Sequence, residues 1–155
     1  MTNLNHLISK QLDALLTNET SLIANMANTS ALINESFDQI NWVGFYLYNY
    51  ANNELTLGPF QGKVACMHIK NGDGVCGTAI TQQSVMRIKN VHEFPGHIAC
   101  DAASNSEIVV PLIKNERLLG VLDIDSPIID RFSLDDEDLI VELAAVFLNH
   151  VDNFE

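Results

Sequence analysis

The sequence is poor in positive charge. It has 8 Lys and Arg residues against 20 Asp and Glu residues, a formal net charge of −12 at pH 7. Affinity for nucleic acid depends largely on cationic side chains that displace counterions from phosphates, and anionic membrane surfaces attract proteins through the same kind of charge. The composition therefore argues against nucleic-acid and membrane partners.

Long apolar runs and targeting signals are also missing. No stretch approaches the roughly 20 apolar residues that span a bilayer. The N-terminus MTNLNHLISKQLDALL lacks the basic start and continuous apolar region of a secretory signal. We therefore expect a cytoplasmic protein. Its 155 residues, 47% of them hydrophobic, suit one domain over residues 1–155 with a single well-filled core.

Metal and dinucleotide motifs are absent as well. The cysteines, Cys66, Cys76 and Cys100, are spaced by ten and 24 positions, with no CxxC or HxxxH pair. Structural zinc sites usually contain such a pair, and the glycines at 72, 74 and 77 do not have GxGxxG spacing. We predict no metal and no tightly bound organic cofactor. Because disulfides are rare in the cytosol, the thiols are expected to be free or catalytic.

The stretch HIACDAASNSEIVVPL, residues 97–112, places Cys100 three positions after His97 and next to Asp101. A nearby imidazolium favours the reactive thiolate, whereas acids oppose it, and a small residue buried under a loop is the alternative. Cys76 opens a predicted helix, where the helix dipole would stabilise its thiolate. Cys66 lies on a predicted strand, and either of these two cysteines could instead be structural. Three clustered thiols make a redox relay a reasonable hypothesis.

The apolar pattern predicts an α+β fold. Helical spacing indicates helices over residues 4–16, 22–37, 75–83 and 139–151, and strand formers indicate strands over 40–48, 55–60, 64–69, 107–113 and 117–124. Ser133 and Asp136 resemble a capping box, and residues 87–106 are expected to form a long loop. This order predicts an antiparallel sheet with the N- and C-terminal helices on one face and a loop-covered pocket on the other.

Two acids stand at the end of an otherwise apolar strand. Asp123 and Asp125 share one side of it, although strands disfavour Asp. With a three-residue turn over 114–116, Glu107 would lie opposite Asp123, and three carboxylates would converge. Such a cluster raises at least one pKa and can bind an ammonium group or a divalent cation. A solvated strand end is the alternative.

Trp42 and Tyr46 share one side of the first predicted strand. Aromatic residues at such positions belong either to the core or to the wall of a small-ligand pocket.

Five segments together resemble a known family. They are GPFQGKVAC (58–66), GDGVCGTA (72–79), VHEFPGHIACDAASNSEIVVPL (91–112), GVLDIDSP (120–127) and RFSLDDEDL (131–139). Their combination is similar to the free methionine-(R)-sulfoxide reductases, which are small GAF-domain proteins. The resemblance covers nearly the whole chain and implies a GAF fold.

The resemblance also implies roles for individual residues. Cys100 matches the catalytic nucleophile, Cys66 the resolving cysteine, and Cys76 a third cysteine that joins disulfide exchange. The residues that match the substrate pocket are Glu107, Asp123, Asp125, Trp42 and Tyr46.

The implied reaction reduces free methionine (R)-sulfoxide through a sulfenic acid and an intramolecular disulfide, which thioredoxin or a similar dithiol reopens. A non-catalytic GAF sensor of a small ligand and a thiol redox sensor remain as alternatives. The amphipathic N-terminal helices could build a homodimer.

Overall fold

The structure, a computed structural model, describes residues 3–97 and 103–152. Cys100 and Asp101 lie outside these residues. In chain order the elements are α1 (Asn3–Leu16), α2 (Leu22–Ser36), β1 (Trp42–Asn49), β2 (Glu54–Gly62), β3 (His68–Lys70), α3 (Gly74–Gln82), β4 (Met86–Ile88), the 3-10 helix η1 (Val91–Glu93), β5 (Ser106–Lys114), β6 (Arg117–Ser126) and α4 (Leu134–Asn149). None of the helices in the described part of the chain has the length and apolar character needed to cross a membrane.

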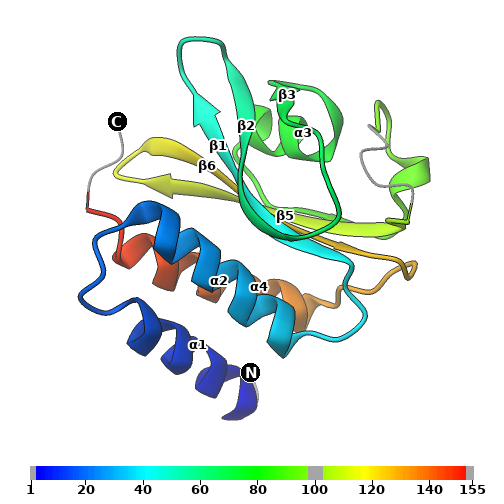
Figure 1. Cartoon of the computed structure of the whole chain (residues 1–155). Helices are drawn as coiled ribbons and strands as arrows, with labels where there is room; N and C mark the ends of the chain where they lie inside the picture. The colour runs from blue at the N-terminus through cyan, green and yellow to red at the C-terminus, as the bar shows by residue number, and fades with distance from the viewer. Residues whose placement is uncertain (1–2, 98–102, 153–155) are drawn as a thin grey trace.

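The six strands form one antiparallel sheet in the order β3-β2-β1-β6-β5-β4. Helices α2 and α4 cover one face, α1 packs on both of them, and α3 lies on the opposite face (Figure 1). The predicted α+β arrangement, with the terminal helices on one side, is therefore confirmed.

Each face of the sheet has its own core because side chains alternate across the strands. Val43, Phe45 and Ile124 point to the terminal helices and join Leu12, Phe147 and their neighbours. Their companions on the same strands, Trp42, Tyr46 and Val121, point to α3. The candidate site residues Trp42, Tyr46 and Cys76 belong to this second core, so strand parity places the two aromatic residues on the α3 face.

The β5–β6 hairpin differs from the expected register. Its loop has two residues, Asn115 and Glu116, both with positive φ (52° and 64°). A two-residue loop alone would have put Glu107 on the opposite face from the aspartates, but an irregularity between Leu112 and Ile113 shifts the pairing by one residue. Glu107 consequently lies opposite Asp125 rather than Asp123, and all three acids share a face.

Two other expectations were wrong in detail. The third strand, expected over 64–69, covers only His68–Lys70, because residues 63–67 leave the sheet edge. The expected loop 87–106 contains η1 and part of β4, because Arg87 and Ile88 pair with the edge of β5.

The predicted capping box at the start of α4 is confirmed. Ser133 and Asp136 each accept a hydrogen bond from the other's backbone N–H.

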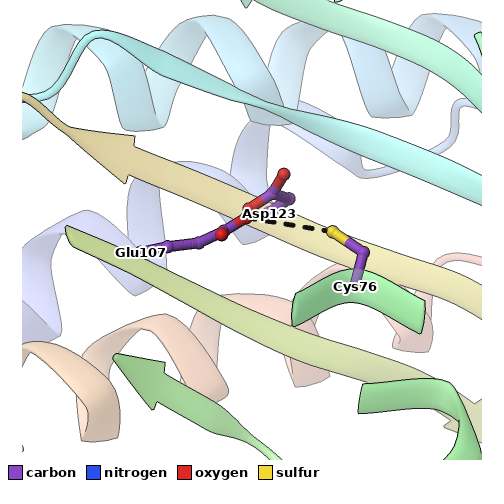
Figure 2. A group of neighbouring side chains, drawn as sticks. All are labelled: Cys76, Glu107 and Asp123. Atoms are coloured by element: carbon purple, nitrogen blue, oxygen red, sulfur yellow. Dashed lines mark hydrogen bonds between the residues drawn. The ribbon is translucent and has the colours of Figure 1, made fainter. Parts of the chain in front are cut away.

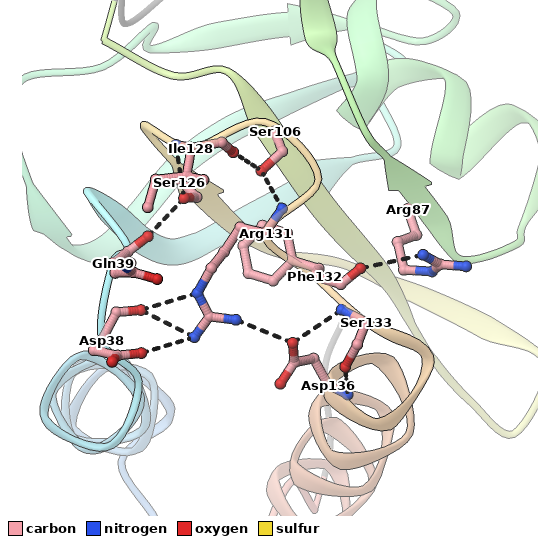
Figure 3. A network of polar contacts seen from close by, with 10 residues as sticks. All are labelled: Asp38, Gln39, Arg87, Ser106, Ser126, Ile128, Arg131, Phe132, Ser133 and Asp136. Carbon is pink, nitrogen blue, oxygen red and sulfur yellow. Dashed lines mark hydrogen bonds and ion pairs between the residues drawn. The ribbon is translucent and has the colours of Figure 1, made fainter.

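A polar network holds together the loops that carry the acid-bearing strand ends (Figure 3). Arg131 donates to the Asp38 carbonyl at 3.0 and 3.2 Å, to Asp38 Oδ1 at 3.2 Å and to Asp136 Oδ2 at 3.0 Å. Ser126 Oγ donates to the Gln39 carbonyl at 2.6 Å. These bonds tie the α2–β1 connection to the segment between β6 and α4.

Arg131→Ala is therefore expected to destabilise the fold by about 2 kcal/mol, because it leaves a carbonyl and two carboxylates without a shared donor. The urea unfolding midpoint measures the effect. Arg117→Ala is the matched control: Arg117 is exposed and lies 4.7 Å from the Tyr50 ring centroid, so its loss should cost less than about 1 kcal/mol. Equal losses for the two variants would contradict a special role for the network.

Candidate active site

A pocket opens on the α3 face of the sheet. Six residues singled out from the sequence line it: Trp42, Tyr46, Cys76, Glu107, Asp123 and Asp125. They come from β1, α3, β5 and β6, so the pocket is assembled by the sheet register and the docking of α3. His97, immediately before residues 98–102, also lines it.

Two of the acids that line the pocket, Glu107 and Asp123, lie next to the Cys76 thiol (Figure 2). Glu107 and Asp123 are 8% and 5% exposed. Cys76 Sγ lies 3.9 Å from Glu107 Oε2, within the limit for a weak thiol hydrogen bond. Asp123 Oδ1 is buried and has no hydrogen-bond partner in the described part of the chain. A buried acceptor of this kind is ready to receive a donor from a ligand.

Burial dominates the electrostatics of this cluster. It raises the pKa of Glu107 well above its usual range, with a further increase from Asp123. Burial, followed by the charge of Asp125, likewise raises the pKa of Asp123. Close carboxylates cannot all ionise without mutual repulsion. The site therefore favours carboxyl groups that hold a proton at a pH where ordinary acids have lost it.

The raised pKa of Asp123 predicts a pH-dependent stability. A carboxyl whose folded pKa exceeds its unfolded value, about 3.9, stabilises the fold fully below that value. This stabilisation is lost as the pH rises through the folded pKa. Asp123→Asn, which cannot ionise, should therefore be more stable than the wild type at pH 8, and the gain should shrink at pH 5.

Urea unfolding at the two pH values measures this gain. Asp138→Asn provides the control, since Asp138 is exposed on α4 and its replacement should give no such pH-dependent gain. A variant less stable than the wild type at pH 8 would contradict the assigned electrostatics of Asp123.

Aromatic rings form one wall of the pocket. Trp42 stacks on Tyr46 with ring centroids 5.8 Å apart, and on Phe60 at 5.2 Å. Trp42 Nε1 donates to the Lys63 carbonyl and Tyr46 Oη to the Cys66 carbonyl, both at 3.1 Å. Burial and the nearby Asp123 raise the pKa of Tyr46, so its hydroxyl keeps its proton and acts as a donor.

The cysteines occupy different environments. Cys76 is a buried, free thiol in the first turn of α3, but burial and the charges of Asp123 and Glu107 raise its pKa well above the usual value. The helix dipole favours a thiolate at this position, but desolvation and the acidic neighbours outweigh it. Cys66 is half-buried and disulfide-bonded. The predicted nucleophile Cys100 is outside the described residues.

The sequence interpretation missed one polar residue of the pocket, Ser104, and one aromatic residue, Phe60, that packs behind its wall. Ser104 is buried, lines the pocket, and its Oγ accepts a hydrogen bond from Asn41 Nδ2 at 3.1 Å. Phe60 extends the aromatic stack from β2. Both lie in segments that resemble the family, but a serine and a core-type aromatic have no local pattern that marks them individually. Desolvation, with a smaller contribution from His92, lowers the pKa of His97, which favours a neutral imidazole at the pocket.

The acid cluster has the geometry to hold a cation. One ligand atom from each of Cys76, Glu107 and Asp123 lies within 4.8 Å of the others. Two carboxylates and a thiol could receive a divalent metal ion after losing their protons. The carboxylate oxygens of Glu107 and Asp123 could instead accept hydrogen bonds from an ammonium group. Binding of an ammonium group does not require Cys76 to be a thiolate. The raised thiol pKa makes the second arrangement the better match.

A family model described as "GAF domain" matches residues 11–150. The fold agrees with this class of protein: it has the antiparallel sheet, the terminal helices on one face and a pocket between β1, β6 and α3. The chain is 53% identical to the free methionine-R-sulfoxide reductase of Escherichia coli (strain K12) over 89% of this chain and 82% of that protein. The structure of fRMsr of Staphylococcus aureus in its reduced form has a TM-score of 0.92 and 49% identity, covering 98% of this chain and 97% of that one.

A free methionine-R-sulfoxide reductase from Neisseria meningitidis, solved in complex with its substrate, has a TM-score of 0.90 and 39% identity, with 97% of this chain and 91% of that chain covered. The chain thus belongs to the free methionine-R-sulfoxide reductase family of GAF-domain proteins.

Proposed function

We propose that this protein is a cytoplasmic oxidoreductase that reduces free methionine (R)-sulfoxide to methionine. The observation that carries the proposal is the convergence of Glu107, Asp123 and Asp125 at a pocket with an aromatic wall. The names of the relatives support the same activity, including one structure solved with its substrate. The preference for the R epimer rests on these relatives.

The acidic pocket accounts for selection of a free amino acid. Its carboxylates would receive the substrate ammonium group, and the unpartnered Asp123 Oδ1 is one available acceptor. A methionine sulfoxide inside a polypeptide has an amide in place of this charged group, so it would lose the charge-assisted bonds and leave the buried acids uncompensated. Trp42 and Tyr46 would pack against the thioether end.

The chemistry requires a nucleophile and an acid. The Cys100 thiolate attacks the sulfoxide sulfur while a protonated carboxyl group hydrogen-bonds to the sulfoxide oxygen and gives it a proton. Oxygen passes to the Cys100 sulfur, methionine leaves, and Cys100 becomes a sulfenic acid. The raised pKa values of Glu107 and Asp123 make these two residues the candidate proton donors.

Cys66 would complete the cycle. Its thiol attacks the Cys100 sulfenic acid, forming a disulfide and releasing water. The disulfide-bonded state of Cys66 beside a free Cys76 supports Cys66 as the resolving residue, while Cys76 would enter later disulfide exchange. Thioredoxin or a similar dithiol then reduces the disulfide.

A homodimer stays a prediction. Leu7, Leu15 and Ile23 are exposed apolar residues on α1 and α2 that a second copy could cover.

Chiral separation tests the function. The protein is incubated with dithiothreitol and a mixture of the two epimers of free methionine sulfoxide, and both epimers and methionine are quantified. Loss of the R epimer alone, with an equal gain of methionine, is the expected result. Persistence of both epimers would contradict the proposal and favour a GAF sensor without turnover. N-acetylmethionine sulfoxide, which lacks the ammonium charge, should be a poor substrate.

A further inference from the structure

The polar hydrogens of the two aromatic pocket residues both point to the backbone of a single segment, residues 63–67, which we call the Cys66 segment. Trp42 Nε1 donates to the Lys63 carbonyl and Tyr46 Oη to the Cys66 carbonyl, each at 3.1 Å. Both donors lie on β1, at positions 2% and 3% exposed. The rings can thus face the pocket while their polar atoms hold the chain that carries a thiol.

The Cys66 segment is neither helix nor strand. It leaves β2 after Gly62 and enters β3 at His68. A backbone bond from Leu57 N–H to the Met67 carbonyl, at 2.9 Å, holds its far end. Val64 and Met67 are 88% and 70% exposed, so these two side chains contribute little packing. Ala65 and Cys66 are half-buried and pack against the second core. Hydrogen bonds to the backbone carbonyls act together with these contacts in fixing where the segment runs.

Gly62 brings the chain into contact with Trp42. Its φ is +139°, and a Cβ atom there would lie 2.6 Å from Trp42 Cδ1 and 2.9 Å from the Asn41 carbonyl oxygen. Any other residue would push the start of the Cys66 segment away from the indole. The absence of a side chain at this position thus permits the bond from Trp42 to Lys63.

We propose that Trp42 and Tyr46 are positioning residues for the resolving thiol: through the Lys63 and Cys66 carbonyls they fix the Cys66 segment at the edge of the substrate pocket. The inference rests on the proposed function and extends it from substrate contact to the second chemical step. In that step the Cys66 sulfur bonds to the Cys100 sulfur, the sulfur–oxygen bond of the sulfenic acid breaks, and the oxygen leaves as water. Holding one partner in place reduces the freedom that must be lost in this step.

Tyr46→Phe tests the role because it keeps the ring and removes the donor. The whole protein is equilibrated in glutathione buffers, where reduced protein and glutathione disulfide give protein disulfide and two glutathione thiols. Alkylation followed by mass spectrometry gives the oxidised fraction at Cys66. The equilibrium constant for forming the disulfide is expected to fall by about tenfold, consistent with the loss of one buried hydrogen bond.

Tyr48→Phe is the matched control. Tyr48 is on the same strand, and its hydroxyl donates to Asn53 Oδ1 at the β1–β2 turn, so the variant should leave the equilibrium constant unchanged. Trp42→Phe, which removes the second donor, should lower the constant as Tyr46→Phe does, and it provides the test if Tyr46→Phe does not fold. Thermal unfolding of each variant separates local positioning from general instability.

Constants equal to the wild type in folded Tyr46→Phe or Trp42→Phe would overturn the proposal. A second readout is the lifetime of the sulfenic acid, trapped with dimedone after one turnover on methionine sulfoxide, which should lengthen relative to Tyr48→Phe. The glutathione equilibrium does not involve methionine sulfoxide. A protein that fails to reduce the sulfoxide but loses disulfide stability in these variants would contradict the proposed function while supporting the positioning role.

Discussion

Cys100→Ser is expected to lower the rate of methionine formation by at least about 10³-fold, because an alcohol at neutral pH is a far weaker nucleophile than a thiolate. Methionine formed from free methionine (R)-sulfoxide with dithiothreitol present measures the loss. Cys100 lies between His97 and Ser104 in the sequence, and both of these described residues line the pocket. A Cys100→Ser variant with more than a tenth of the wild-type rate would exclude Cys100 as the nucleophile.

Cys66→Ser provides the contrast. Without a reductant it should still release about one equivalent of methionine per chain, because the first step needs only Cys100 and an acid. The sulfenic acid should then persist instead of condensing to a disulfide. Cys100→Ser should release none. The amount of methionine released without a reductant therefore distinguishes loss of the nucleophile from loss of the resolving thiol. A steady-state rate does not distinguish them, because both variants would be slow.

Glu107→Gln is expected to lower kcat/KM by roughly 10²- to 10⁴-fold, the usual range for loss of a general acid. Glu107 is buried beside Asp123 and near the Cys76 thiol, and burial raises its pKa. Glu107 must be protonated to act as the acid. Wild-type activity should therefore fall as the pH rises through the raised pKa of Glu107. Initial rates across pH measure both effects, and Glu107→Gln should lose this alkaline limb.

Asp125→Asn separates binding from proton donation. Asp125 lies opposite Glu107 in the hairpin and lines the same pocket. Loss of its charge should raise the KM for the free amino acid and reduce the discrimination against N-acetylmethionine sulfoxide, because one ammonium partner is removed. Glu35→Gln, at an exposed position on α2, is the charge-matched control and should leave kcat/KM unchanged. An equal effect of Glu35→Gln and Asp125→Asn would indicate a response to net charge only.

The sequence by itself determined the kind of fold. The 3.6-residue spacing of apolar residues located the long helices, and strand formers located β1, β2 and the β5–β6 hairpin, because these patterns reflect which face of each element is buried. Parity also placed Asp123 and Asp125 on one side of β6, and Trp42 and Tyr46 on one side of β1. The short elements β3, β4 and η1 were misjudged, since their formation depends on neighbouring strands and loops rather than on their own residues.

Only the tertiary structure decided how the site is assembled. The two-residue hairpin loop and the irregularity in the β5–β6 pairing place Glu107 opposite Asp125, and no local pattern in the sequence distinguishes this register from one with a longer loop. Burial outweighs the helix dipole at Cys76 and raises the pKa of its thiol, because desolvation depends on everything packed around the sulfur. The bonds from Trp42 and Tyr46 to the Cys66 segment join residues about twenty positions apart in sequence. Such long-range contacts exist only once the sheet has brought β1 and the end of β2 together.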